Sequence, residues 1–190
     1  MIEILNEIIE FIQSSGFFGA VIGSFFIVIE SMLPVLPLMV FITINFLIFG
    51  NIIGFIISWF FTIIGCLLSY NLFKKGFSKK YNKYIKDKET LKKYTKKFNN
   101  ITLPQLTLLI AIPFTPAFMV NIAAGLINMD FKKYFYSLLI GKIALVYFWG
   151  FVGTSFIDSI KNPIILIRIC ILVGVAYLIS YIVDKKLKLK

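Results

Sequence analysis

The sequence has no histidine, only two cysteines and only 9 acidic residues. Without histidine, a zinc-histidine hydrolase and a Ser-His-Asp triad are excluded. Cys66 and Cys170 stand separately in apolar stretches without the C-x-x-C spacing of a metal site, so we expect both to be small buried hydrophobic residues. A glycine-rich phosphate loop and a G-x-S-x-G motif are also missing. We therefore expect no enzyme, no metal site and no cofactor.

Charge is scarce in the chain of 190 residues, and apolar residues are abundant. Charged residues make up 15% and hydrophobic residues 59%, whereas soluble domains carry about 25% charged residues. The 20 Lys and Arg residues against 9 Asp and Glu residues give a net charge of +11. Long apolar runs in such a composition predict an all-α integral membrane protein.

Apolar and polar stretches divide the chain into segments. Residues 1–15 place acidic and apolar residues on opposite helical faces, which predicts an amphipathic helix on the membrane surface, and 16–190 are expected to form one membrane domain. Two apolar stretches, 33–50 and 103–129, are broken by prolines. The uninterrupted apolar stretches predict about four transmembrane helices, at 17–32, 52–73, 134–156 and 163–183.

The two proline-broken stretches match each other at a fixed offset. Pro34 and Pro37 lie 79 positions before Pro113 and Pro116. Matched broken segments, each followed by a full span, are typical of internally duplicated transporters, with chance similarity of apolar sequence as the alternative. The predicted parts are repeat 1 over about 17–73, a basic segment 74–100, repeat 2 over about 101–157 and a final helix 163–183.

Lysine positions predict the orientation of the chain. Residues 74–100 and 185–190 are rich in lysine, so both are expected on the cytoplasmic side, as are both termini. Aromatic residues between the lysines of 74–100 favour contact with an anionic leaflet over nucleic acid, and a solvated loop that only fixes the topology is the alternative. The stretch 33–50 then enters the membrane from outside and 103–129 from inside. The sequence thus predicts two oppositely facing re-entrant hairpins in an inverted repeat, lining a polar path.

Three motifs carry a resemblance to a known membrane protein family. They are Glu30 with Pro34-Val-Leu-Pro37, the glycine, tyrosine and lysines of Gly65 to Gly76, and Pro113-Phe-Thr-Pro116 with Asn121 and Gly125. Over about 20–155 the sequence resembles the DedA family, the bacterial branch of the proteins with a VTT domain. In that family an arginine usually stands three residues before the first proline of the second motif, and here that position is Ile110.

The resemblance implies lipid translocation in the plasma membrane of a bacterium. Family members are thought to move undecaprenyl phosphate or phospholipids between leaflets, often in dependence on the proton-motive force. The implied partners are membrane lipids with an anionic phosphate headgroup. The alternatives are a proton- or cation-coupled transporter of a small solute and a non-transporting membrane scaffold. The sequence leaves open which lipid or solute moves, whether protons are coupled and whether the chain forms a homo-oligomer.

Charged residues within apolar stretches are the first candidates for a substrate or proton site. Glu30 leads, because an acid at membrane depth costs about 2.5–3.5 kcal/mol; a glutamate that snorkels to the surface is the alternative. Lys142 lies deep in its predicted span and is placed to replace the arginine that is absent at Ile110. Arg168 is either a site cation or an interfacial anchor.

Uncharged residues complete the candidate set. Asn121 and Thr115 either hydrogen-bond a phosphate group or cap freed backbone groups. The residues expected to shape the hairpins and to permit close helix packing are Pro34, Pro37, Pro113, Pro116, Gly65 and Gly125.

Overall fold

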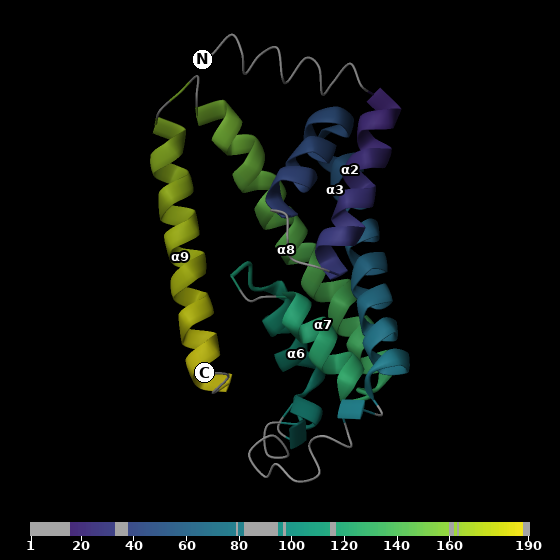
Figure 1. Cartoon of the computed structure of the whole chain (residues 1–190). Helices are drawn as coiled ribbons and strands as arrows, with labels where there is room; N and C mark the ends of the chain where they lie inside the picture. Colours follow the sequence, from purple (N-terminus) through teal and green to yellow (C-terminus); the bar gives the residue numbers. More distant parts are fainter. Residues whose placement is uncertain are drawn as a thin grey trace.

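The computed structural model describes residues 16–32, 38–78, 80–81, 95–96, 98–114, 117–159, 162 and 164–187. The predicted surface helix 1–15 and the residues Pro34, Pro37, Thr115 and Pro116 lie outside this part. All regular structure of the described residues is helical, which confirms the predicted all-α class (Figure 1). The helices are α2 (Gly16–Met32), α3 (Leu38–Gly76), α6 (Leu103–Ala111), α7 (Ala117–Leu126), α8 (Phe131–Ser159) and α9 (Ile164–Leu187).

Helix α3 consists of two arms that meet at Gly50. This residue has φ 74° and ψ 176°, a conformation that glycine adopts without strain. The Asn45 side-chain amide donates to Ser58 Oγ at 3.1 Å, although these residues would be about 20 Å apart along a straight helix. The chain therefore folds back at Gly50, which separates a first arm, 38–49, from a second arm, 51–76.

The first arm of α3 pairs with α2. The rings of Phe26 and Phe41 stack at 5.1 Å, and a Cβ on Gly23 would lie 3.2 Å from Asn45 Oδ1. The earlier residue of α2 thus meets the later residue of the arm, so the two helices are antiparallel. In Figure 1, α2 runs from the upper end of the molecule to mid-height and the first arm returns to the upper end. We call this pair of helices hairpin 1.

Three helices of the described residues are long and apolar enough to cross a membrane, where the sequence predicts about four spans. They are Leu38–Gly76, Phe131–Ser159 and Ile164–Val183. The stretch predicted as the first span forms α2, which has 17 residues and ends at Met32. Pro34 explains this end, because the residue before a proline is disfavoured in the α conformation.

Helices α6 and α7 follow each other as hairpin 2, which rises from the lower end in Figure 1 and returns to it. Within it, α6 packs mainly on α8 and α7 packs mainly on α3. A capping box starts α6: the Thr102 hydroxyl accepts from the Gln105 backbone N–H, and the Gln105 side chain accepts from Thr102 N–H. The helix ends at Ala111, two residues before Pro113. The two hairpins thus point toward each other from opposite ends of the molecule.

The offset of 79 residues recurs in the helix boundaries. Met32 ends α2 and Ala111 ends α6, while Leu38 begins the first arm of α3 and Ala117 begins α7. Each hairpin is also followed by a long helix, the second arm of α3 or α8 (Figure 1). The match therefore extends from the prolines to the helices on both sides of them.

Glycine contacts repeat with a similar offset, since Gly65 and Gly141 are 76 positions apart. A Cβ atom on Gly65 would lie 2.8 Å from the Val28 carbonyl oxygen, and one on Gly141 would lie 2.9 Å from the Thr107 carbonyl oxygen. Val28 and Thr107 are themselves 79 positions apart. In both halves, the short helix that enters the molecule packs on the long helix through a glycine without room for a side chain.

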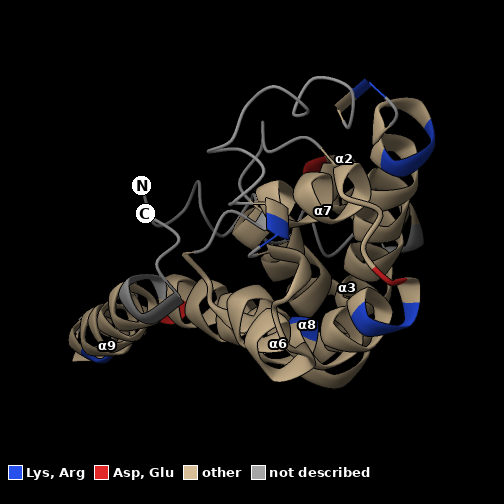
Figure 2. Ribbon diagram, turned by 90° about the horizontal axis from the view of Figure 1, so that it is seen from below, with Lys and Arg blue, Asp and Glu red and all other residues tan. Residues whose placement is uncertain are grey.

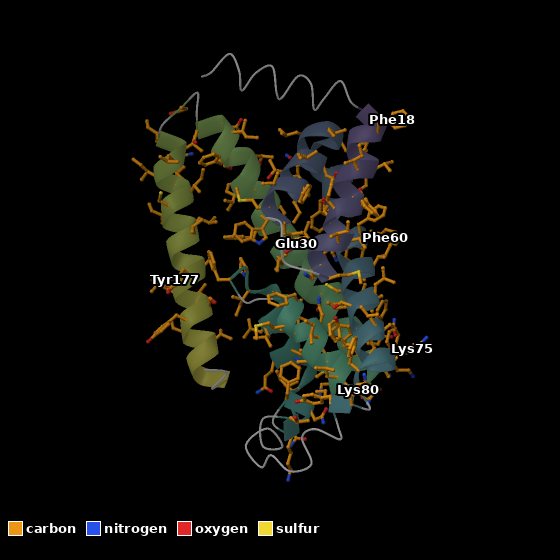
Figure 3. All side chains as sticks on the ribbon, viewed as in Figure 1. Phe18, Glu30, Phe60, Lys75, Lys80 and Tyr177 are labelled. Atoms are coloured by element: carbon orange, nitrogen blue, oxygen red, sulfur yellow. The ribbon has the colours of Figure 1, made fainter. Side chains whose placement is uncertain are left out.

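The outer surface of the helices is apolar. Phe18 is 78% exposed and Tyr177 is 59% exposed, and both point outward with Phe60 in Figure 3. Figure 2, from below, shows most of the helical ribbon without charge, and Lys75 and Lys80 lie toward the lower end in Figure 3. An apolar wall with charge at its end suits a protein surrounded by lipid.

Candidate functional site

Glu30 and Lys142 lie close together inside the molecule. Lys142 is only 1% exposed, Glu30 is half-buried, and the two are close enough for their charges to interact. Figure 3 shows Glu30 at mid-height, away from both ends. The structure therefore brings together the two charged residues that the sequence ranks first. Both lie away from the two ends of the helix bundle, where a side chain would have to be in order to snorkel to the membrane surface.

Local structure explains both positions. Glu30 is in the last turn of α2, whose end at Met32 leaves this turn at mid-height. Lys142 is eleven residues into α8, about 16 Å along the helix. Because Gly141 has no side chain, α6 approaches α8 here, and Ile110 Cγ2 would lie 2.9 Å from a Cβ on Gly141. Lys142 thus stands beside the position where the resemblance implies an arginine.

Asn121 connects hairpin 2 to the last turn of α2 in hairpin 1. Its side-chain amide donates to the Ser31 carbonyl oxygen at 3.2 Å, and its Oδ1 accepts from the Tyr134 hydroxyl at 2.8 Å. The Ser31 carbonyl is among the last four of α2, which have no partner within the helix. Of the two roles considered for Asn121, this geometry is that of a cap for freed backbone.

Tyr134 and Tyr70 extend this network toward the lower end of the molecule. Their rings stack at 4.7 Å, the Tyr70 hydroxyl donates to the Met129 carbonyl at 2.7 Å, and Lys74 Nζ donates to the Tyr70 hydroxyl at 3.0 Å. Both tyrosines are fully buried. Sequence reasoning missed Tyr134 as a site residue, although a phenol inside an apolar span signals a hydroxyl that needs a partner.

The remaining candidates lie elsewhere. Arg168 is exposed on α9 and is not brought to Glu30 and Lys142. Gly125 allows close packing, because a Cβ there would lie 2.5 Å from the Tyr70 carbonyl oxygen, and Pro113 lies half-buried in the turn after α6. Thr115 is outside the described residues. Within the described residues, no group of three His, Cys, Asp or Glu side chains could hold a metal ion.

The two cysteines differ in their surroundings. Cys66 is buried, as expected, but Cys170 is exposed, so the prediction that both are buried is wrong for Cys170. The reason is the position of α9. This helix packs against α8 along one side, and only 11% of its apolar stretch is buried inside the molecule. Apolar neighbours in the sequence are expected both for a residue buried in protein and for one that faces lipid. Cys170 is of the second kind.

Comparisons with known proteins place the chain in a family of membrane proteins. The model of the VTT domain matches residues 33–155, which include α3, α6 and α7 and most of α8. YhjE of Bacillus subtilis (strain 168), described as an uncharacterized membrane protein, is 27% identical over 185 residues, which are 97% of this chain and 89% of YhjE. YqeD of the same organism is 23% identical over 148 residues, 78% of this chain and 71% of YqeD. No solved structure matches the chain.

Proposed function

The chain belongs to the VTT domain family, the DedA family of membrane proteins, and from this membership we propose that it translocates lipid across a bacterial plasma membrane. The proposed cargo is a lipid with an anionic phosphate headgroup, such as undecaprenyl phosphate or a phospholipid. One observation carries the proposal: a half-buried glutamate in the last turn of α2 in hairpin 1 lies close enough to a buried lysine of α8 for their charges to interact, in a molecule whose two hairpins enter from opposite ends.

The proposed membrane placement follows from the shape of the molecule and the positions of the lysines. The second arm of α3, α8 and α9 cross the bilayer, and both hairpins are re-entrant. Lys74 and Lys75 end α3 at the lower end of the molecule, which is therefore cytoplasmic. This placement puts the start of α2 on the outer side, in place of the cytoplasmic start that the sequence predicts.

The charge pair explains how a headgroup would pass a hydrocarbon core of about 30 Å. Lys142 supplies an ammonium group at mid-depth for a phosphate oxygen, and Glu30 balances that charge when no headgroup is present. The two hairpins approach this level from opposite ends, and irregular backbone at membrane depth must be buried in protein or line a polar path. The acyl tails stay in the bilayer throughout, and a proton on Glu30 would leave Lys142 free for the phosphate.

Leaflet exchange in proteoliposomes tests the proposal. We expect exchange of labelled undecaprenyl phosphate or labelled phospholipid, and a decrease of about tenfold in Glu30→Gln, equivalent to about 1.4 kcal/mol of barrier height. The matched control is Asp158→Asn, the same chemical change at an exposed position of α8, which should leave exchange unchanged. Correctly inserted wild-type protein that exchanges no lipid would contradict the proposal and favour a solute transporter or a scaffold.

A second prediction concerns the arginine that this chain lacks. Lys142→Ala should lose exchange, and adding Ile110→Arg to it should restore exchange to within about tenfold of wild type, since the guanidinium remains charged at mid-depth. The reason is proximity: Ile110 contacts Gly141, the neighbour of Lys142. Ile110→Leu in the same Lys142→Ala chain is the control and should restore nothing. A folded Ile110→Arg, Lys142→Ala protein without exchange would show that the two positions are not equivalent.

A further inference from the structure

Tyr134 is a buried residue of α8 that the proposed translocation step does not use. Its side chain is 0% exposed and its ring stacks on Tyr70. Its hydroxyl lies 2.8 Å from Asn121 Oδ1 and 3.3 Å from the Cys66 carbonyl oxygen, so both of its neighbours are acceptors. The hydroxyl therefore donates its proton to a partner that is itself part of hairpin 2.

Asn121 also makes a hydrogen bond to hairpin 1. With its Oδ1 occupied by a donor, the amide can present only its NH₂ group to the other side, and this group donates to the Ser31 carbonyl oxygen at 3.2 Å. Among the described residues, no other side-chain hydrogen bond joins α2 to α7. Ser31 directly follows Glu30 in the last turn of α2. The position of Glu30 thus depends on a turn whose free carbonyl is held from the other half of the chain.

We infer that Tyr134 is a positioning residue for Glu30, acting through Asn121 and the Ser31 carbonyl. The hydroxyl of Tyr134 sets the orientation of the Asn121 amide, and the amide fixes the last turn of α2 opposite Lys142. In an apolar interior, such a bond is stronger than in water, and its loss leaves both the carbonyl and the amide unsatisfied. Only the transport part of this inference rests on the proposed function.

The first test measures the surroundings of Glu30 without any transport. The probe is dicyclohexylcarbodiimide, which modifies carboxyl groups in apolar surroundings, with the labelled peptide identified by mass spectrometry. Tyr134→Phe keeps the ring and its stacking but removes the hydroxyl, and it should change the labelling rate of Glu30 about fivefold, as for one buried hydrogen bond. Asn121→Leu should change it to the same extent, and the double variant should add nothing further.

Ser137→Ala is the matched control. Ser137 is also buried on α8, and its hydroxyl donates to the Leu103 carbonyl at 3.3 Å, a bond to α6 that does not involve α2. The labelling rate of Glu30 should be unchanged in this variant. An unchanged rate in folded Tyr134→Phe and Asn121→Leu proteins would overturn the inference, as would an equal change in Ser137→Ala.

The second test uses lipid exchange. Tyr134→Phe should lower exchange about fivefold in the wild-type chain and have no further effect in the Glu30→Gln chain, because a positioning residue acts only through the residue it positions. Equal losses in both chains would overturn the inference. If wild-type protein exchanges no lipid while the labelling rate still responds to Tyr134→Phe, the proposed function fails and the positioning role stands.

Discussion

Lys142→Met is expected to lower the free energy of unfolding by about 3 kcal/mol. Lys142 is 1% exposed, and it is the cation that acts on Glu30. Removing it leaves Glu30 at mid-depth without a counter-charge, so this side chain must either keep a desolvated charge or take up a proton, and the stabilising interaction of the pair is lost. Unfolding in detergent, followed by the fluorescence of Trp59 and Trp149, measures this loss.

The double variant separates charge imbalance from lost packing. Glu30→Gln combined with Lys142→Met removes both charges, so we expect it to unfold within about 1 kcal/mol of wild type. Arg168→Met is the control for the loss of a cation, and its exposed position on α9 should make the change nearly neutral. If the double variant lost as much free energy of unfolding as Glu30→Gln and Lys142→Met lose together, the two charges would not act on each other.

Gly65→Ala and Gly141→Ala are each expected to destabilise the protein by about 2 kcal/mol. A Cβ on Gly65 would lie 2.6 Å from Ser31 Cβ, and one on Gly141 would lie 2.9 Å from the Thr107 carbonyl oxygen. These distances are too short for real atoms, so α2 or α6 would have to move away from its long helix. The same thermal or denaturant unfolding measures both variants, and similar losses are expected because the contacts are equivalent.

Gly174→Ala supplies the control for these glycines. A Cβ on Gly174 would meet nothing within 4 Å, and this position lies within α9. Alanine is the better helix former by up to about 1 kcal/mol, so this variant should be as stable as wild type or slightly more stable. If Gly65→Ala behaved like Gly174→Ala, close approach of α2 to the second arm of α3 would not be needed for stability.

Much of the fold was predictable because prolines act locally. Pro113 ends α6 at Ala111 by steric exclusion of the α conformation, whatever the rest of the chain does. The offset between the two proline pairs likewise indicated matched segments, and the helix boundaries follow it. The depth reached by α2 was not predictable in this way, because an apolar helix that stops inside a membrane has the same composition as one that crosses it completely.

Part of the site was also predictable from local features of the sequence. A charge within an apolar run stands out without any knowledge of its neighbours, so Glu30 and Lys142 were identified as candidates. Their proximity, and the hydrogen bond from Asn121 to the Ser31 carbonyl, depend on contacts between distant parts of the chain. Tyr134 was missed because its partners follow no sequence spacing: Asn121 precedes it by 13 residues, and Cys66 by 68.

The short entering helices have a consequence for biosynthesis. The ribosome completes α2 and α6 before the long helices that carry Gly65 and Gly141, the surfaces on which they pack. With nine residues, α6 covers about 14 Å, too little to be retained in a bilayer as a span of its own. Helix α6 can therefore take its final place only after α8, which carries Gly141, has been made. The Asn121 amide that binds the Ser31 carbonyl is synthesised 90 residues after it, so the first half of the protein reaches its final form only after the second half has been made.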